Sequence, residues 1–284
     1  MLRDIRELAG DPEAYAEELK RRWTGLLSYR YIGRNHGAMN TGEIDNTVAL
    51  RHDMRNAAGG ILVSPISLSA PEGATKSDLE AVPNPVIHCC HILDDARDVK
   101  RIEVIQSEPL KEGARMCYSR SKIVDADDHS RVIAFTEGQG VSIGRPPEGL
   151  QKIPEDKIVV VDSPDLPPLW KVFGASKRGD GKWVLPELSL ELASPDAALH
   201  LGPQHIVLET AATDMAAQLV GTDRLQMSTW HVMFMARGKR GPFRVEGQAV
   251  RGVGDQVGVR MLLIDEGDDD RAVTCASALM RVVG

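Results

Sequence analysis

The longest helical pattern lies in the last third of the chain. Between Gly202 and Gly221 apolar residues occupy nearly the whole circumference of an expected helix, and Asp214 lies in its second half. A helix that is apolar on all sides is expected to be buried on all sides. Strand-like runs follow it at 226–235, 243–253, 256–264 and 272–283. We therefore expect these strands to curl round the helix.

A similar order of elements precedes this segment. Residues 47–54 alternate like a strand, residues 55–60 break the pattern, and an apolar segment over 61–70 has the character of a helix. Further strands are expected at 86–93, 99–107, 114–124 and 132–143. The order strand, glycine-rich break, buried helix and long antiparallel strands thus occurs in both halves. Identity between the halves is slight, so the repeat is one of pattern only.

The remaining segments set the expected domain boundaries. An amphipathic helical region begins the chain, and Pro12 suits the first turn of its second helix. From 144 to 182 the chain is rich in proline, glycine and charge, and a strand is expected at 184–192. We therefore expect a helical lead-in at 1–30, a first domain at 31–145, a connection at 146–182 and a second domain at 183–284.

Composition narrows the class of protein. The chain has 284 residues, 42% hydrophobic and 26% charged, as in a soluble globular protein. Its net charge of −7 argues against nucleic acid as a partner, because phosphate binding needs a basic face. No apolar run approaches the roughly 18–20 residues of a membrane helix, and the charged N-terminus is unlike a signal peptide. Its four cysteines do not form a disulfide framework. We expect a cytoplasmic protein without a nucleic-acid or membrane partner.

Two short segments carry a resemblance to a known family. Asn56-Ala-Ala-Gly-Gly60 in the first half, and Gln204-His205 through Asp214 in the second, resemble the hot-dog fold of the acyl-CoA thioesterase superfamily. Its members include phenylacetyl-CoA-type and 4-hydroxybenzoyl-CoA-type thioesterases. In this family an antiparallel sheet wraps a central helix. The resemblance implies an α+β class and a tandem, or double, hot-dog in one chain.

The family motif is incomplete in the second half. Many members have an asparagine before His-Gly-Gly at the start of the helix, and an acid about two turns later. His205 stands at the position of the motif histidine, and Asp214 at that of the acid. Ile206 and Val207 replace the two glycines.

The first half has the asparagine and the glycines of the motif but lacks its histidine and its acid. Asn56, Gly59 and Gly60 are present, but Ala58 replaces the histidine and Ser67 stands where the acid would be. Because the pocket of this fold lies between two hot-dog units, the resemblance implies one composite site that draws on both halves.

Thioester hydrolysis assigns roles to these residues. A helix N-terminus offers unpaired N–H groups to an oxyanion, so Gly60 is expected to donate and Asn56 to orient. Asp214 is expected to act as general base or nucleophile, and the family uses its acid both ways. Glu209 projects about 140° away from Asp214 on the helix, at roughly 100° per residue, which favours Asp214 as the catalytic acid. His205 completes the expected catalytic set; a residue that only packs or caps the helix is its structural alternative.

Other residues are expected to contact substrate. These are Gly59 and Ser67, which stand at motif positions, and Glu209 and Thr210, which lie on the same helix as Asp214. The basic loop with Arg237, Lys239 and Arg240 suits the phosphates of CoA, although a solvated hairpin loop has the same composition.

His88-Cys-Cys-His91 has the composition of a metal site. On a strand His88 and Cys90 face one side while Cys89 and His91 face the other, so all four cannot bind one ion. We expect no metal and no cofactor other than the CoA of the substrate.

The sequence favours an acyl-CoA thioesterase-like hydrolase. A hydratase or dehydratase acting on enoyl or hydroxyacyl thioesters is an alternative on the same scaffold. A non-catalytic, acyl-thioester-binding double hot-dog is a third, favoured by the incomplete motifs. Double hot-dogs often associate further, so a homo-oligomer is also expected.

Overall fold

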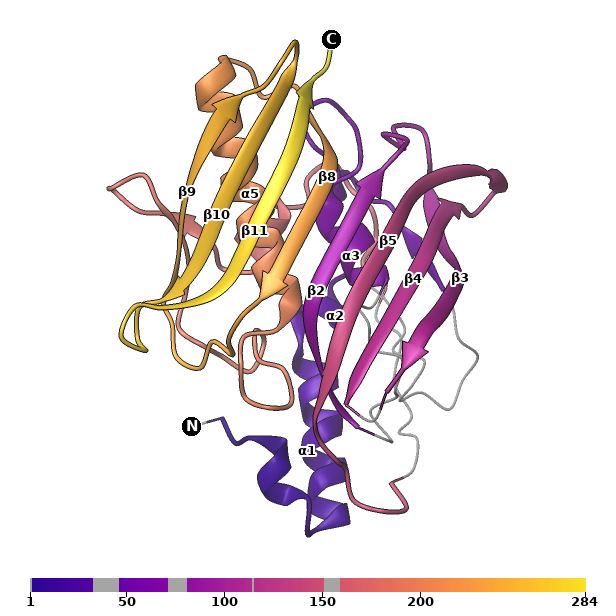
Figure 1. The fold of residues 1–284 in the computed structure, drawn as a ribbon, viewed down its shortest axis with the longest axis vertical. Helices are drawn as coiled ribbons and strands as arrows, with labels where there is room; N and C mark the ends of the chain where they lie inside the picture. Colours follow the sequence, from indigo (N-terminus) through magenta and orange to yellow (C-terminus); the bar gives the residue numbers. More distant parts are fainter. Residues whose placement is uncertain (1, 33–45, 71–80, 114, 151–158) are drawn as a thin grey trace.

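A computed structural model describes residues 2–32, 46–70, 81–113, 115–150 and 159–284. Within these residues one antiparallel sheet of eleven strands runs through the whole molecule, in the order β1-β3-β4-β5-β2-β8-β11-β10-β9-β7-β6. Figure 1 shows its two halves side by side, with helices α3 and α5 on the same face of the sheet. The halves meet where β2 pairs with β8.

The first half contains strands at one end of this order and a short helix. Its helix, α3, spans Val63–Ser69, and every one of its residues is buried. The strands are β1 (Thr47–Ala49), β2 (Val82–Ile92), β3 (Arg101–Glu112), β4 (Met116–Asp125) and β5 (Asp128–Gly144).

The second half wraps the longer helix, α5 (Leu201–Val220), which packs against β9, β10 and α3. The small elements α4 (Leu169–Val172), β6 (Ser176–Lys177) and β7 (Trp183–Leu185) extend this half at its outer edge. The long strands are β8 (Leu225–Phe234), β9 (Phe243–Arg251), β10 (Gln256–Asp265) and β11 (Arg271–Val282).

Local signals at both ends explain the bounds of α5. Nδ1 of His200 accepts a hydrogen bond from the Gly202 N–H and caps the first turn. Gly221 adopts a left-handed conformation with φ of 81°, which ends the helix. The helix is buried from Gly202 to Glu209, but Gln218 and Leu219 are exposed. Burial on all sides was therefore a correct prediction for the first turns and a wrong one for the last.

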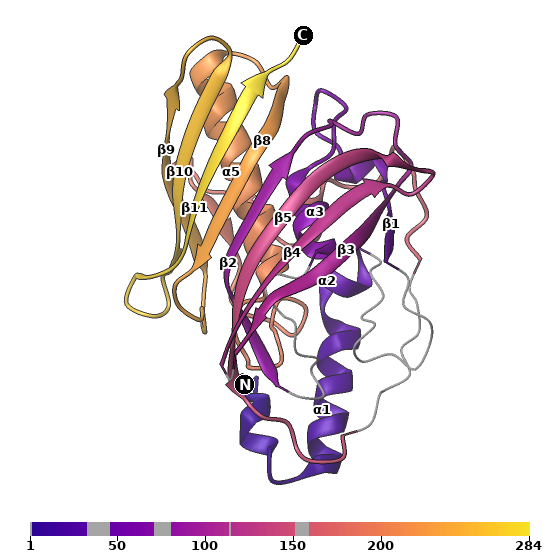
Figure 2. The ribbon, with the colours of Figure 1, turned by 45° about the vertical axis from the view of Figure 1, so that its right-hand side comes forward.

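The N-terminal lead-in is confirmed as helical. A 3₁₀ helix over Ile5–Leu8 precedes α1 (Pro12–Gly25) and α2 (Leu27–Arg30). The Asp11 carboxylate accepts from the Ala14 N–H, so α1 begins where Pro12 was expected to begin it. Figure 2 shows α1 extending beyond the sheet, where it closes a small separate apolar core.

Two strand predictions were too long. The run over 47–54 is a strand only at 47–49 and then forms a 3₁₀ turn at His52–Met54. The run over 184–192 ends after Leu185, because Pro186 has no N–H to continue the ladder. The expected connection, 146–182, also contains α4 and β6, and β6 pairs with β7 in the sheet of the second half.

The two halves share one apolar core across the β2–β8 contact. Cys90 of β2 lies opposite Trp230 of β8, and both are fully buried. Trp230 is among the largest fully buried side chains. In the part of the chain that the structure describes, no helix is long and apolar enough to cross a membrane.

Candidate functional site

The turn before α3 is tied to the second half by Asn56. Its Oδ1 accepts hydrogen bonds from the N–H groups of Ala58 and Gly60, both at 3.0 Å. Its Nδ2 donates to Oε1 of Gln226 on β8 at 2.6 Å, and Gln226 is fully buried. The N–H of Gly60, expected to face a substrate oxyanion, is therefore bonded to Asn56.

Gly59 and Gly60 are required for different reasons. Gly59 has a φ of 83°, and a Cβ atom there would meet open space. A Cβ at Gly60 would lie 2.0 Å from Oε1 of Gln226 and 3.2 Å from the carbonyl oxygen of Asp95. Backbone conformation selects glycine at 59, and the close approach of β8 selects it at 60.

This difference predicts a coupling between Gly60 and Gln226. Gly60→Ala should lower the free energy of unfolding by about 2 kcal/mol through overpacking. In a Gln226→Ala background this loss should be smaller by at least about 1 kcal/mol. Gly59→Ala should cost about the same in both backgrounds, since its cost comes from the positive φ. A double-mutant cycle from urea unfolding measures both. An equal cost of Gly60→Ala in the two backgrounds would contradict the contact.

The acid that reaches the start of α3 is Glu209. Its Oε1 accepts from the Val63 N–H at 2.6 Å, and its Oε2 accepts from the N–H and the hydroxyl of Ser64 at 2.9 and 2.5 Å. The side chain is buried between the helices. Burial raises the pKa of Glu209 above its usual value, and the hydrogen bonds from Ser64 and Val63 oppose this rise. Glu209 thus supplies the missing cap of α3.

Asp214 lies in different surroundings. Its Oδ2 accepts from Nζ of Lys177 on β6 at 2.7 Å and from Nε1 of Trp183 on β7 at 3.1 Å. Gln218, one turn further along α5, also bonds to the carboxylate. These partners all belong to the second half, whereas the Asn56 side chain bonds to the Gly60 N–H of the first half and to Gln226 on β8.

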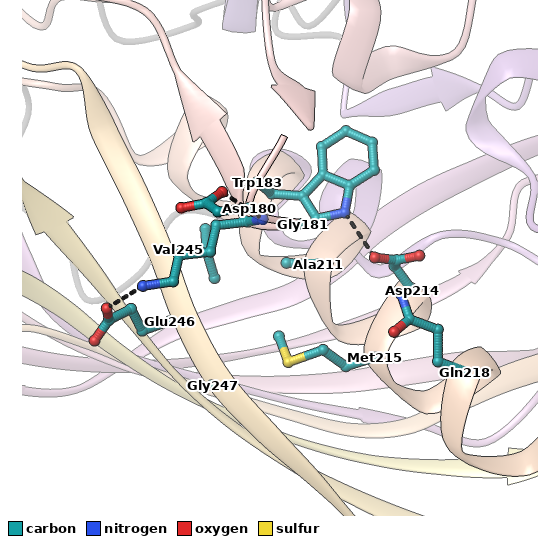
Figure 3. Close-up of a pocket in the computed structure, with 11 residues that line it drawn as sticks. Asp180, Gly181, Trp183, Ala211, Asp214, Met215, Gln218, Val245, Glu246 and Gly247 are labelled. Atoms are coloured by element: carbon teal, nitrogen blue, oxygen red, sulfur yellow. Dashed lines mark hydrogen bonds and ion pairs between the residues drawn. The ribbon is translucent and has the colours of Figure 1, made fainter. Parts of the chain in front are cut away.

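A pocket with a volume of about 440 Å³ opens beside Asp214. Its walls come from α5, from the β6–β7 hairpin and from β9, and Figure 3 shows Asp214, Met215 and Gln218 on the helical wall. Trp183 lies across from them, with its indole nitrogen toward the carboxylate. The lining of the pocket contains apolar surface, from Met215 and Ala211, as well as charged groups.

The electrostatics of the pocket favour an ionised Asp214. Partial burial of the carboxyl opposes ionisation, but the hydrogen bonds from Lys177, Gln218 and Trp183, together with the charge of Lys177, hold its pKa below the usual value. The side chain is 27% exposed. A charged carboxylate in contact with an open pocket is the form that can act as a base or nucleophile at neutral pH.

His205 and Ser67 lie inside the core, away from this pocket. Nδ1 of His205 accepts from Nε1 of Trp230 at 3.0 Å, and burial lowers the pKa of the ring to about 3. The ring of His88 on β2 packs edge-on against that of His205, with centroids 5.3 Å apart. Nε2 of His88 lies 2.9 Å from Oγ of Ser67 on α3. Side chains from both halves thus form a buried polar cluster, and its His205 is neutral at physiological pH.

Comparison with known proteins rests on structure alone, because no protein-family model and no curated protein matches the sequence. The TesB protein of Mycobacterium avium subspecies paratuberculosis is similar to this chain, with a TM-score of 0.54 and 13% identity over 86% of this chain and 96% of that one. Acyl-CoA thioesterase II TesB2 of Mycobacterium marinum gives 0.53 and 13% over 87% and 95%. A hot-dog-fold protein of unknown function from Alicyclobacillus acidocaldarius gives 0.52 and 9% over 88% and 98%.

The chain has a double hot-dog fold. The matches extend over both halves, so the expected α+β tandem hot-dog is confirmed. At this level of identity the likeness concerns the fold, and the site must be argued from the residues of this chain.

The basic loop of the double hot-dog is held by buried acids. Arg237 forms an ion pair with Asp196 at 2.7 Å, and Nζ of Lys239 donates to the Asp196 carbonyl at 2.5 Å. The Asp265 carboxylate accepts from the N–H groups of Lys239, Arg240 and Gly241 at 2.7–3.1 Å. Within the described residues, the side chain of Arg240 is exposed and makes no contact with Asp196 of the kind that Arg237 and Lys239 make.

The remaining expected positions have local roles. The Thr210 hydroxyl donates to the carbonyl of Ile206 within α5 at 2.7 Å. On β2 the expected alternation is confirmed, since His88 and Cys90 are buried while Cys89 is half-buried and His91 is exposed.

Sequence reasoning missed Lys177, Trp183 and Gln226. The signal for the first two was present, because Lys177-Arg-Gly-Asp-Gly-Lys-Trp183 has the turn residues of a tight hairpin that places its first and last residues opposite each other. Gln226 is a polar residue on the inward face of an apolar strand, and its partner could not be found from the sequence.

Proposed function

We propose that this double hot-dog hydrolyses an acyl thioester, with Asp214 as the reacting acid. The observation that carries the proposal is a carboxylate on the central helix, in contact with Lys177, at the wall of a pocket of about 440 Å³. The likeness of the fold to a protein described as an acyl-CoA thioesterase II supports the class of reaction. In this proposal Asn56, Gly59, Gly60 and His205 maintain the contact between the halves and do not touch the substrate.

Asp214 can act by either of two routes. As general base it accepts a proton from a water molecule that adds to the thioester carbonyl; the thiol then leaves with a proton and the carboxylic acid is released. As nucleophile it attacks the thioester carbonyl and forms an anhydride with the acyl group as the C–S bond breaks and the thiol leaves with a proton; water then hydrolyses the anhydride, which releases the carboxylic acid and restores the Asp214 carboxylate. In both routes the proposal assigns stabilisation of the developing oxyanion to Lys182, which lines the pocket and whose ammonium group also pairs with Glu246. Met215, Ala211 and Val245 provide apolar surface for the acyl group.

Acyl-CoA is the proposed form of the thioester. Arg240 offers an exposed cation to a phosphate of CoA, whereas Arg237 and Lys239 are engaged with Asp196. Their contribution to CoA binding is therefore expected to be smaller than that of Arg240.

The test is thiol release from short, medium, long and aryl acyl-CoAs by wild type beside Asp214→Asn. Loss of a general base should lower kcat/KM at least about a hundredfold. Asp223→Asn removes the same charge at an exposed site just beyond α5 and should leave turnover unchanged. Turnover that is equal in wild type and Asp214→Asn would show that another group performs the chemistry.

A non-catalytic acyl-thioester-binding protein is the second candidate. It is favoured by one observation: the N–H donors at the start of α3 are already bonded, to Asn56 at Gly60 and to Glu209 at Val63 and Ser64. Saturable binding of an acyl-CoA by calorimetry, with no thiol release from any thioester, would support this candidate against hydrolysis.

A further inference from the structure

The β6–β7 hairpin is built to present its side chains to α5. Lys177 pairs with Trp183 in the ladder, and the Arg178 N–H donates to the Lys182 carbonyl to close the turn. Gly181 adopts a positive φ of 82°, and Oδ1 of Asp180 accepts from the Lys182 N–H. The hairpin is therefore ordered by its own backbone.

Two donors from this hairpin converge on one oxygen of Asp214. Nζ of Lys177 and Nε1 of Trp183 lie 2.7 and 3.1 Å from Oδ2. The indole of Trp183 packs against that of Trp170 on α4, with ring centroids 5.2 Å apart and planes inclined by 69°. This contact fixes the position of the indole. The hairpin therefore sets the position of the Asp214 carboxylate, through the indole N–H, and also supplies the positive charge that it faces, Lys177.

We propose that Lys177 is a positioning residue, which keeps the Asp214 carboxylate ionised and oriented toward the pocket. The inference rests on the proposed function, because it assigns a role in the same site. Lys177 does not touch the substrate in this proposal and acts through Asp214.

The other charged groups around the pocket are paired among themselves. Nζ of Lys182 donates to Oε1 of Glu246 at 2.8 Å, and Glu246 also forms an ion pair with Arg244. Asp180 faces Arg178 at 3.6 Å. Among the residues described, Lys177 is thus the cation in direct contact with Asp214. If Lys177 is removed, partial burial still opposes ionisation, so the pKa of Asp214 should rise.

The experiment uses the indole N–H of Trp183 as a reporter, since it donates to the carboxylate that titrates. The protein is labelled with ¹⁵N-tryptophan, and the signal of Trp183, one of four tryptophans, is assigned with Trp183→Phe. Its titration is followed in wild type, Lys177→Met and Lys177→Arg. We expect the midpoint to rise by at least about one pH unit in Lys177→Met, a tenfold change in the acid dissociation constant. Lys177→Arg should restore most of the wild-type midpoint.

Two controls distinguish the effect of the Lys177–Asp214 contact on the midpoint from the effect of a change in net charge. Lys171→Met removes the same charge from an exposed position on α4 and should leave the midpoint unchanged. Asp214→Asn should abolish the titration of the Trp183 signal. A midpoint that is the same in wild type and Lys177→Met, or that moves equally in Lys171→Met, would overturn the inference.

Activity then distinguishes this inference from the proposed function. If both hold, the acid limb of kcat/KM against pH should move with the Trp183 midpoint in Lys177→Met, because the free enzyme must carry ionised Asp214. A shifted midpoint without thiol release by wild type would retain the contact but overturn the hydrolase and the positioning role. Thiol release with an acid limb that stays in place in Lys177→Met would overturn the positioning role alone.

Discussion

Glu209→Ala should lower the free energy of unfolding by about 3–5 kcal/mol. The substitution leaves the N–H groups of Val63 and Ser64 and the Ser64 hydroxyl without their acceptor inside the protein. Each buried donor that loses its partner costs about 1–3 kcal/mol. α3 also loses the acid at its N-terminus, and no residue of its own caps it. Urea unfolding at pH 7, followed by circular dichroism, measures the change.

Two variants test the cause of this loss. Glu209→Gln keeps one acceptor oxygen and should cost about half as much. Glu187→Ala removes a charge from an exposed loop and should lie within about 0.5 kcal/mol of wild type. A Glu209→Ala protein as stable as Glu187→Ala would contradict the assignment of Glu209 as the cap of α3.

Trp230→Ala should cost about 3–5 kcal/mol, through a cavity at the contact between the halves. Trp230 is fully buried, lies opposite Cys90 on β2, and packs in the core that both halves share. Its removal also deprives Nδ1 of His205 of its donor. Thermal and chemical unfolding report the loss, which should appear in one transition if the two halves unfold together.

Met233, on the same strand, provides a matched control. Its side chain lies on the outer face of the sheet and is 38% exposed, so Met233→Ala should cost about 0.5 kcal/mol or less. Trp230→Phe should lie between the two, because it keeps a ring in the core but loses the hydrogen bond to His205. Equal costs at 230 and 233 would mean that the two sides of β8 are wrongly assigned.

The two acids of α5 show how one helix serves both halves. They are five residues apart and point in directions about 140° from each other, at roughly 100° per residue. Glu209 faces α3 and fills the place where the composite site was expected. Asp214 faces the β6–β7 hairpin and a pocket within the second half. The division is a direct result of helical periodicity, once the neighbours on each side are known.

The elements themselves could be predicted from periodicity. Alternation over 226–235 and 272–283 corresponds to β8 and β11 to within a residue or two, and the apolar run after Gly202 corresponds to α5. These runs are long, and an apolar residue in the wrong phase would face solvent, so the pattern is strict. Short segments were predicted less well: the strand expected at 184–192 ends after Leu185, and the 3₁₀ turn at His52–Met54 was not expected.

The sequence by itself determined the order of helices and strands, the repeat of that order in the two halves and the presence of two acids in one largely apolar helix, while the α+β class followed from the resemblance. It did so because burial and hydrogen bonding along the chain follow periods of two and 3.6 residues. Only the tertiary structure decided which acid meets which partner. Lys177, Trp183, Val63 and Gln226 reach their partners across 31 to 170 residues of sequence. Local propensity does not predict such contacts, because they depend on how the strands and helices pack together in the folded chain.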